Sequence, residues 1–269
     1  MRTLVAMTNA PWTGMVPIDD TAIAVTDTGG PAVPVVYLNG SYASQRHWRR
    51  TIAQLGSGRR HITFDERARG GSRRSSDYSF EACLRDLDAV LEARGIDRPI
   101  LVGWSYGAYL GVFWADRHPG RVSAVVSVDG ALPYGLTDDE GQRRIRVLFG
   151  RMRLLLPIAA PFGLAARMSA GQHAEVNIEI NEIAASCGPV LDRVRCPVRY
   201  VLAAGDALGS RNGEHDDARA ALEPHLVANS CLRVSGKVTS NHSSILRKDA
   251  RAVARAVHEA AAAAPWLAR

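Results

Sequence analysis

A buried strand that runs through a serine directly into a helix constrains this chain more than any other feature. The apolar run Ile100–Val102 leads through Gly103–Gly107, with the sequence G-W-S-Y-G, into a helical pattern that extends to His118. Glycines two residues before and after the serine allow strand and helix to approach closely. This geometry predicts that Ser105 is a nucleophile raised above the sheet at a strand-to-helix elbow. A purely structural turn is the alternative interpretation.

Strand-like and helix-like segments alternate on both sides of this turn. The predicted strands are 35–38, 61–64, 100–102, 122–128, 198–203 and 232–234. The predicted helices are 45–55, 80–94, 106–118, 216–227 and 244–262, with Ser79 as the cap of the second. This order predicts an α/β fold with a mostly parallel, doubly wound sheet covered by helices on both faces.

The segment 131–194 interrupts the alternation. It contains no convincing strand, and one of its helical patterns gathers Ile145, Phe149 and Met152 on an apolar stripe with arginines largely off it. We therefore expect an α/β core made of residues 1–130 and 195–269, with a helical cap inserted at 131–194. An ordinary packing pair of helices and a membrane-surface helix are the alternatives.

His242 is better placed than the other seven histidines to act as a base for Ser105. A serine hydroxyl is a weak nucleophile until a positioned base accepts its proton. His242 lies between the last predicted strand and the last predicted helix, which puts it at the same carboxyl edge of the sheet as Ser105. A surface histidine in a loop is the alternative interpretation.

Two backbone N–H groups are expected to stabilise an oxyanion near Ser105. Tyr106 follows the nucleophile and supplies one donor, and Ser41 supplies the other from the loop after the first predicted strand. The residues expected to contact a substrate are Asn39, Gly40, Trp104, Phe149 and Met152.

The net charge of +6 does not form a nucleic-acid-binding stripe, because the basic residues are dispersed as pairs such as Arg49/Arg50. The four cysteines form no CxxC motif, and no run approaches the length of a membrane span. The apolar stretch Leu4–Met7 is too short for a signal peptide. We expect a cytoplasmic protein with reduced thiols, no nucleic-acid partner and no metal, and the oligomeric state stays open.

Taken together, these features resemble the α/β-hydrolase superfamily over nearly the full chain. They are most similar to its small bacterial esterases, lactonases and cofactor-free haloperoxidases. Ile18–Gly30 resembles the opening hairpin of the superfamily, Asp65–Ser72 its D-x-R-G-x-G-x-S motif and residues 118–122 its h-P-x-R-V motif.

Two loops depart from the superfamily's pattern. Asn39 stands where a histidine usually precedes the oxyanion-hole glycine, and Ala68-Arg69 replaces the usual Gly-His. Both departures concern the support of the loops near the site, and neither removes a catalytic group.

The resemblance implies a carboxylate that orients His242, and two residues are candidates. Superfamily members usually carry this acid after the penultimate strand, where the nearest acid here is Asp206. Some members carry it one strand earlier, where Asp129 follows the strand 122–128. Either carboxylate would fix the imidazole tautomer and stabilise the imidazolium. An acid that tethers the cap entrance is the alternative role for Asp129.

The resemblance also implies a serine hydrolase that needs no metal or organic cofactor. Its expected substrate is a small apolar carboxylic ester, thioester or lactone, cleaved through a Ser-His-Asp triad and an acyl-enzyme. An acyltransferase or a carbon–carbon bond hydrolase of secondary metabolism would use the same residues. A small-molecule-binding protein that kept the fold and lost turnover is the remaining alternative.

Overall fold

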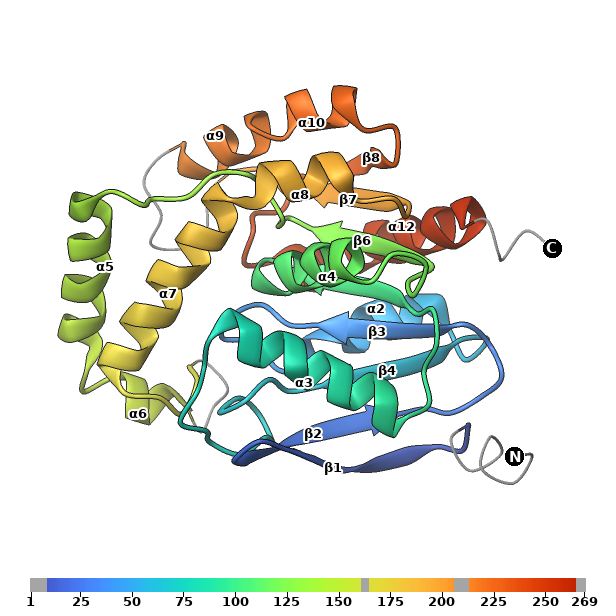
Figure 1. Ribbon diagram of the computed structural model, residues 1–269, viewed down its shortest axis with the longest axis horizontal. Helices are drawn as coiled ribbons and strands as arrows, with labels where there is room; N and C mark the ends of the chain where they lie inside the picture. Colours follow the sequence, from blue (N-terminus) through green and yellow to red (C-terminus); the bar gives the residue numbers. More distant parts are fainter. Residues whose placement is uncertain (1–8, 161–164, 206–212, 265–269) are drawn as a thin grey trace.

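A single twisted sheet of eight strands runs through the centre of the molecule (Figure 1). The computed structural model describes residues 9–160, 165–205 and 213–264. The strands are β1 (Trp12–Ile18), β2 (Thr21–Asp27), β3 (Pro34–Leu38), β4 (Arg60–Phe64), β5 (Ile100–Trp104), β6 (Ala124–Val128), β7 (Val198–Leu202) and β8 (Leu232–Lys237). Their order across the sheet is β1-β2-β4-β3-β5-β6-β7-β8. β1, β2 and β4 pair antiparallel, and every pair from β4 to β8 is parallel, which confirms the predicted sheet.

Helices cover both faces of this sheet. They are η1 (Gln45–Trp48), α2 (Arg49–Leu55), α3 (Phe80–Ala93), α4 (Tyr106–Arg117), α5 (Asp139–Met152), α6 (Leu156–Ala159), α7 (Ala170–Ala185), α8 (Cys187–Arg193), α9 (Glu214–Ala220), α10 (Glu223–Ala228), α11 (Ile245–Lys248) and α12 (Ala250–Ala263). Figure 1 shows α3 and α4 in front of the sheet and α2 and α12 behind it. Each layer buries its own apolar cluster against the strands, so the doubly wound α/β architecture is confirmed.

Local sequence explains where these elements begin and break. The Ser79 hydroxyl accepts a hydrogen bond from the Ala82 N–H and caps α3, as predicted. The stretch predicted as one helix over 216–227 is two helices, because Pro224 in the first turn of α10 lacks the N–H that would continue α9. The stretches 45–55 and 244–262 are likewise divided, into η1 and α2 and into α11 and α12.

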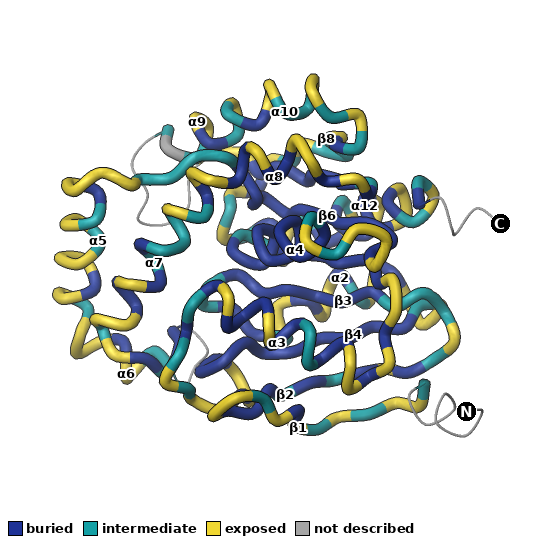
Figure 2. The backbone as a smooth tube through the Cα atoms, viewed as in Figure 1, coloured by how far each residue is buried: buried dark blue, intermediate teal, exposed yellow. Residues whose placement is uncertain are grey.

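Four helices, α5 to α8, connect β6 to β7, and the described part of 131–194 holds no strand. α5, α6 and α7 lie beyond the carboxyl ends of the parallel strands, and the outward side of α5 is exposed (Figures 1 and 2). In contrast, α8 packs against the core: Cys187, Val190 and Leu191 share one apolar cluster with residues of α4. No helix within the described ranges has the length and hydropathy needed to cross a bilayer.

Candidate active site

Ser105 lies at the predicted turn between β5 and α4. Its backbone has φ 55° and ψ −117°, a region that a residue with a side chain enters only at a cost of about 1–3 kcal/mol. The flanking glycines are required by close approach: a Cβ on Gly103 would lie 2.2 Å from the Gly107 carbonyl oxygen, and one on Gly107 would lie 2.2 Å from the Leu38 carbonyl oxygen. Packing of strand against helix therefore holds the serine in its strained conformation.

His242 faces this serine from the loop that follows β8. Its Nε2 lies 3.0 Å from Ser105 Oγ, within hydrogen-bonding distance. The Trp104 indole donates to the His242 carbonyl oxygen at 3.2 Å, and the two rings lie 5.8 Å apart. The residue before the nucleophile thus fixes the backbone of the histidine.

Asp129 completes a line of hydrogen bonds with these two residues. Its Oδ2 lies 2.9 Å from His242 Nδ1. Asp129 follows β6 with a left-handed φ of 46°, and a Cβ on the next residue, Gly130, would lie 2.3 Å from the Ser105 carbonyl oxygen. The turn after β6 therefore packs directly on the elbow. Asp206, the other acid considered, lies outside the described residues.

The Asp129 carboxylate is buried and accepts hydrogen bonds from two further groups. Oδ1 accepts from the Ala203 N–H at 2.9 Å and from Arg219 Nε at 3.0 Å, and Oδ2 accepts from Arg219 Nη2 at 3.0 Å. Burial alone would raise the pKa of Asp129, but hydrogen bonds and charge from His242 and Arg219 outweigh it and lower the pKa well below its ordinary 3.8. The carboxylate is accordingly ionised at neutral pH.

The two expected oxyanion donors lie in the turn after β3, which carries Ser41, and at the start of α4, where Tyr106 follows Ser105. The turn after β3 closes with a hydrogen bond from the Ala43 N–H to the Gly40 carbonyl, which leaves the N–H of Ser41 outside that bond. A Cβ on Gly40 would lie 3.0 Å from the Trp104 ring, so this turn sits against the end of β5. Tyr106 is the first residue of α4, where N–H groups have no partner within the helix and the helix dipole is positive.

Asn39 is fully buried beneath this turn. Its N–H and its side-chain Nδ2 both donate to the Glu66 carboxylate at 2.9 Å, and Nδ2 also donates to the Phe64 carbonyl. Its Oδ1 accepts from the Trp48 indole at 2.8 Å. Because every polar atom of the amide bonds within the protein, the structure places Asn39 as support for the turn and not on a surface that a substrate reaches.

Arg69 supports the same turn from the other side. The buried guanidinium donates to the Ser41 carbonyl oxygen at 2.8 Å and to the Arg67 carbonyl oxygen at 3.0 Å. Ala68 has a φ of 62°, the left-handed conformation that suits the glycine usual at this position in the superfamily. The two departures in sequence, at Asn39 and Arg69, thus meet around the loop that carries Ser41.

A small cavity of about 140 Å³ opens at Ser105. It lies between the sheet edge, α4, α7 and α9. Its lining residues are Ser105, Tyr109, Asp129, Gly130, Leu132, Tyr134, Ile180, Asn181, Ala184, His215, Ala218 and His242.

Phe149 and Met152 do not line this cavity. They pack with Leu156 and Ala174 in a separate apolar cluster of α5, α6 and α7. Phe149 stacks on His173 with ring centroids 5.5 Å apart and lies 6.4 Å from the ring of Tyr42. Phe149 thus lies near the turn that carries Ser41, while Ile180 and Ala184 of α7 border the cavity itself.

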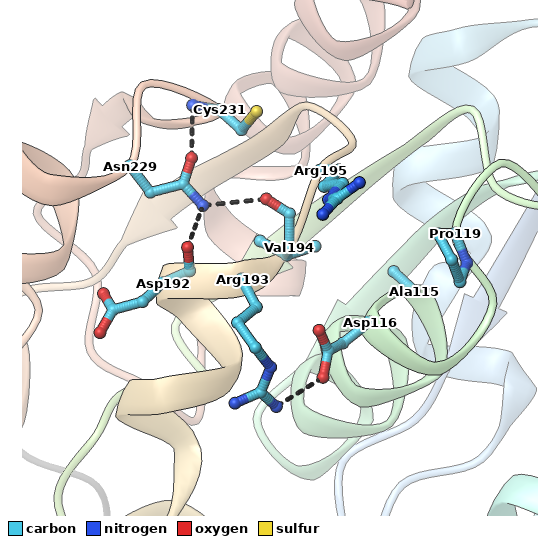
Figure 3. Close-up of a pocket in the computed structure, with 9 residues that line it drawn as sticks. All are labelled: Ala115, Asp116, Pro119, Asp192, Arg193, Val194, Arg195, Asn229 and Cys231. Atoms are coloured by element: carbon cyan, nitrogen blue, oxygen red, sulfur yellow. Dashed lines mark hydrogen bonds and ion pairs between the residues drawn. The ribbon is translucent and has the colours of Figure 1, made fainter.

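A larger hollow of about 650 Å³ lies elsewhere on the surface and contains none of these residues (Figure 3). In it Arg193 pairs with Asp116 at 2.8 Å, and the Asn229 amide donates to the carbonyl oxygens of Asp192 and Val194. These polar groups pair with one another within the protein. Ser105 and His242 therefore line the smaller cavity and not this hollow.

Sequence reasoning missed Arg219 and His215. Both lie on α9, one turn apart. His215 places its ring 4.9 Å from the ring of His242, while Arg219 bonds Asp129. No spacing in the sequence joins Arg219 to an acid ninety residues earlier. The fold topology could have indicated α9, because a helix that follows β7 in such a sheet starts at the edge where ligands bind.

A mostly parallel eight-stranded sheet with a serine at the turn into a helix defines the α/β-hydrolase class. The family model of the alpha/beta hydrolase fold matches residues 33–161. A haloalkane dehalogenase from Mesorhizobium japonicum is 30% identical over 146 residues, which cover 54% of this chain and 47% of that protein. An sn-1-specific diacylglycerol lipase from mouse is 33% identical over 105 residues, 38% of this chain and 34% of that protein.

Among solved structures, a thermophilic esterase from Thermogutta terrifontis superposes with a TM-score of 0.70 at 17% identity, covering 93% of this chain and 97% of that one. The chain therefore has the α/β-hydrolase fold, and the model of that family matches just under half of its length. Its alignments span less than half of the length of these two curated relatives.

Proposed function

We propose that this chain is a serine hydrolase that cleaves carboxylic esters, thioesters or lactones through an acyl-enzyme on Ser105. The observation that carries this is the continuous line of hydrogen bonds from Ser105 Oγ to His242 and on to Asp129, at 3.0 Å and 2.9 Å. A base within hydrogen-bonding distance of a strained, partly exposed serine, itself oriented by a buried carboxylate, is the arrangement that activates a hydroxyl.

The proposed reaction starts when Ser105 Oγ attacks the carbonyl carbon and its proton passes to His242 Nε2. Asp129 holds the Nδ1 proton and stabilises the imidazolium that forms. The N–H groups of Ser41 and Tyr106 stabilise the oxyanion, to which each contributes about 2.7–4 kcal/mol in comparable sites. His242 then protonates the leaving alcohol or thiol, and water attacks the acyl-enzyme with His242 again as base. Asn39 and Arg69 hold the Ser41 turn in place.

The chemistry of serine favours acyl substrates over alkyl halides, although one relative is a haloalkane dehalogenase. Attack of Ser105 Oγ on a saturated carbon would release halide and leave an ether on the serine. An ether has no carbonyl for water to attack, so the enzyme would stop after one turnover. An ester on the same oxygen is hydrolysed by the machinery that made it.

In this proposal, α5 to α7 form a cap over the site, and α8 belongs with the core against which it packs. The cavity beneath is less than half of the 300 Å³ at which pockets for drug-sized ligands begin. Only the small acyl part of a substrate fits it, with Leu132, Ile180 and Ala218 as its apolar walls.

The test is turnover of p-nitrophenyl acetate and butyrate by the parent chain, Ser105→Ala and His242→Gln, together with labelling by a fluorophosphonate probe. We expect Ser105→Ala and His242→Gln each to lose at least a thousandfold in kcat/KM, since the nucleophile and base act as a unit. Labelling should need both residues. Ser123→Ala, a substitution in the loop between α4 and β6, serves as a matched control and should retain activity. Full turnover by Ser105→Ala would contradict the mechanism, and an unlabelled, inactive parent would favour a binding protein.

A further inference from the structure

Arg219 holds the Asp129 carboxylate in a two-pronged hydrogen bond at the centre of the proposed site. Nε meets Oδ1 and Nη2 meets Oδ2, both at 3.0 Å, which is the parallel fork geometry that arginine forms with carboxylates. The Asp129 side chain is 0% exposed and that of Arg219 is 10% exposed, so solvent screens the pair weakly. This is a buried ion pair one hydrogen bond away from the proposed base.

The pair leaves the carboxylate no freedom to turn. A carboxylate has about four acceptor positions. All four are occupied, two by Arg219, one by the Ala203 N–H and one by His242. The guanidinium is itself fixed, because Nη1 donates to Asp216 at 2.8 Å and Nη2 donates to the Gly205 carbonyl at 2.9 Å. Arg219 thereby connects the turns after β6 and β7 to α9.

The same contact divides the negative charge of Asp129 between two partners. During the proposed reaction His242 becomes an imidazolium that Asp129 stabilises. A permanent cation on the far side of the same carboxylate opposes that second positive charge. The other titratable groups around the His242 ring are Ser105 and Tyr109 of the elbow and α4, His215 of α9 and Tyr134 of the loop after β6. Asp216 of α9 is a further charged group, and it pairs with the Arg219 guanidinium.

We propose that Arg219 is a positioning residue that fixes the plane of Asp129 and whose charge opposes the second positive charge that forms on His242. The inference rests on the proposed function for its catalytic consequence, and on the geometry alone for its effect on His242. The hydrogen-bonded fork sets the direction in which Asp129 holds the His242 ring, and the guanidinium charge acts against formation of the imidazolium. The same charge weakens the stabilisation of the imidazolium by Asp129.

The kinetic test compares the pH profile of kcat/KM for the parent, Arg219→Gln and Arg219→Lys. In Arg219→Gln we expect the acid limb to move to higher pH by about one unit, which is a tenfold change in proton affinity, and kcat to fall at least tenfold. Arg219→Lys keeps the charge and loses the fork, so it should keep the acid limb near the parent position while kcat falls.

A matched control is Arg117→Gln, which breaks an exposed arginine–carboxylate fork with Glu81 at the other end of α4. It should leave both the acid limb and kcat unchanged. If Arg219 were only structural, Arg219→Gln would lose stability and kcat with the acid limb in place, and that result overturns the proposal.

A second measurement does not depend on turnover. Titration of the His242 ring by NMR in Ser105→Ala, with the signal assigned by its absence in His242→Gln, should show a midpoint about one pH unit higher when Arg219→Gln is added. An unchanged midpoint overturns the proposal. If Ser105→Ala retained ester turnover, the proposed function would fail while this titration would still decide the role of Arg219.

Discussion

Glu66 is the residue whose ionisation bears most directly on the turn that carries Ser41. It is almost fully buried, and its two carboxylate oxygens accept hydrogen bonds from the N–H and the side chain of Asn39. Burial raises the pKa of Glu66 to about 7, although Arg69 and the Asn39 hydrogen bonds act in the opposite direction. The folded chain thus holds this proton over a range in which an unfolded chain releases it.

This difference predicts a pH-dependent stability. The unfolded glutamate releases its proton near pH 4.5 and the folded one near 7, so the folded state binds more protons between these values. The contribution of Glu66 to the free energy of unfolding is therefore complete below pH 4.5. It should fall by about 3 kcal/mol as the pH rises through 7.

Urea unfolding of the parent and Glu66→Gln between pH 4 and 8 measures the effect. Glu66→Gln should remove most of this slope, while Glu175→Gln, which alters an exposed carboxylate on α7, should keep it. Parallel curves for the parent and Glu66→Gln would rule the assignment out.

Among individual residues, Ser105 and His242 could be predicted from the sequence, but the acid that bonds His242 could not. The elbow and the loop after the last strand carry local signals, namely paired glycines and chain order. Asp129 and Asp206 both follow strands at one edge of the sheet, so only coordinates separate them. The structure brings Asp129 to His242, while Asp206 lies outside the described residues. Arg219 carries no local signal, since its partner is set by tertiary packing alone.

Among the contacts between helices and strands, the close approach of α4 to β3 and β5 most constrains the position of Ser105. Gly107 lies in the first turn of α4, where a Cβ would come within 2.2 Å of the Leu38 carbonyl and 2.8 Å of the Asn39 carbonyl. The helix cannot move away without shifting Ser105, and the backbone of β3 is held in the sheet on both sides.

Gly107→Ala should therefore abolish ester turnover and lower the free energy of unfolding by more than about 3 kcal/mol, because the added methyl meets backbone atoms. The matched control is Gly111→Ala, one turn further along α4. Its Cβ would make ordinary contacts of 3.4 Å with the side chains of Leu38 and Val125. Alanine favours a helix over glycine by up to about 1 kcal/mol, so this control should be neutral or slightly stabilising. Thermal and urea unfolding of both variants provide the measurement, and equal effects would contradict the packing account.

The alternation of strands and helices could be predicted because each buried strand is a short apolar run with clear ends. The breaks inside helices could not be predicted as well. The apolar pattern of 216–227 continues across Pro224, and only the missing N–H divides it. The position of the insertion was predicted from its lack of strands, but nothing in its periodicity indicated that α7 borders the cavity while Phe149 and Met152 pack apart from it.

If Ser105 acts as proposed, the whole molecule determines which acyl groups reach it, because the cavity is assembled from α4, α7, α9 and the turn after β6. A cavity of about 140 Å³ should favour p-nitrophenyl acetate and butyrate over the octanoate. Ile180→Ala removes a wall on α7 and should shift kcat/KM toward the octanoate by about tenfold, in keeping with roughly 1–3 kcal/mol for a change of this size in an apolar pocket.

Ile158→Ala serves as the control for that shift, since Ile158 of α6 is 65% exposed and lies outside the cavity lining. It should leave the ratio of activities on the two chain lengths unchanged. If Ile180→Ala kept the parent ratio as well, α7 would not limit the acyl group.

Under the proposed mechanism, the place of His242 after β8 has a consequence for how the protein gains activity as it folds. Ser105 and Asp129 follow β5 and β6 in the middle of the sheet, whereas the base arrives only when the eighth strand has docked against β7. An intermediate that lacks this last pairing carries the serine without the group that activates it. Recovery of turnover during refolding would therefore report the docking of the final strand, and incomplete chains on the ribosome would hold an inert hydroxyl.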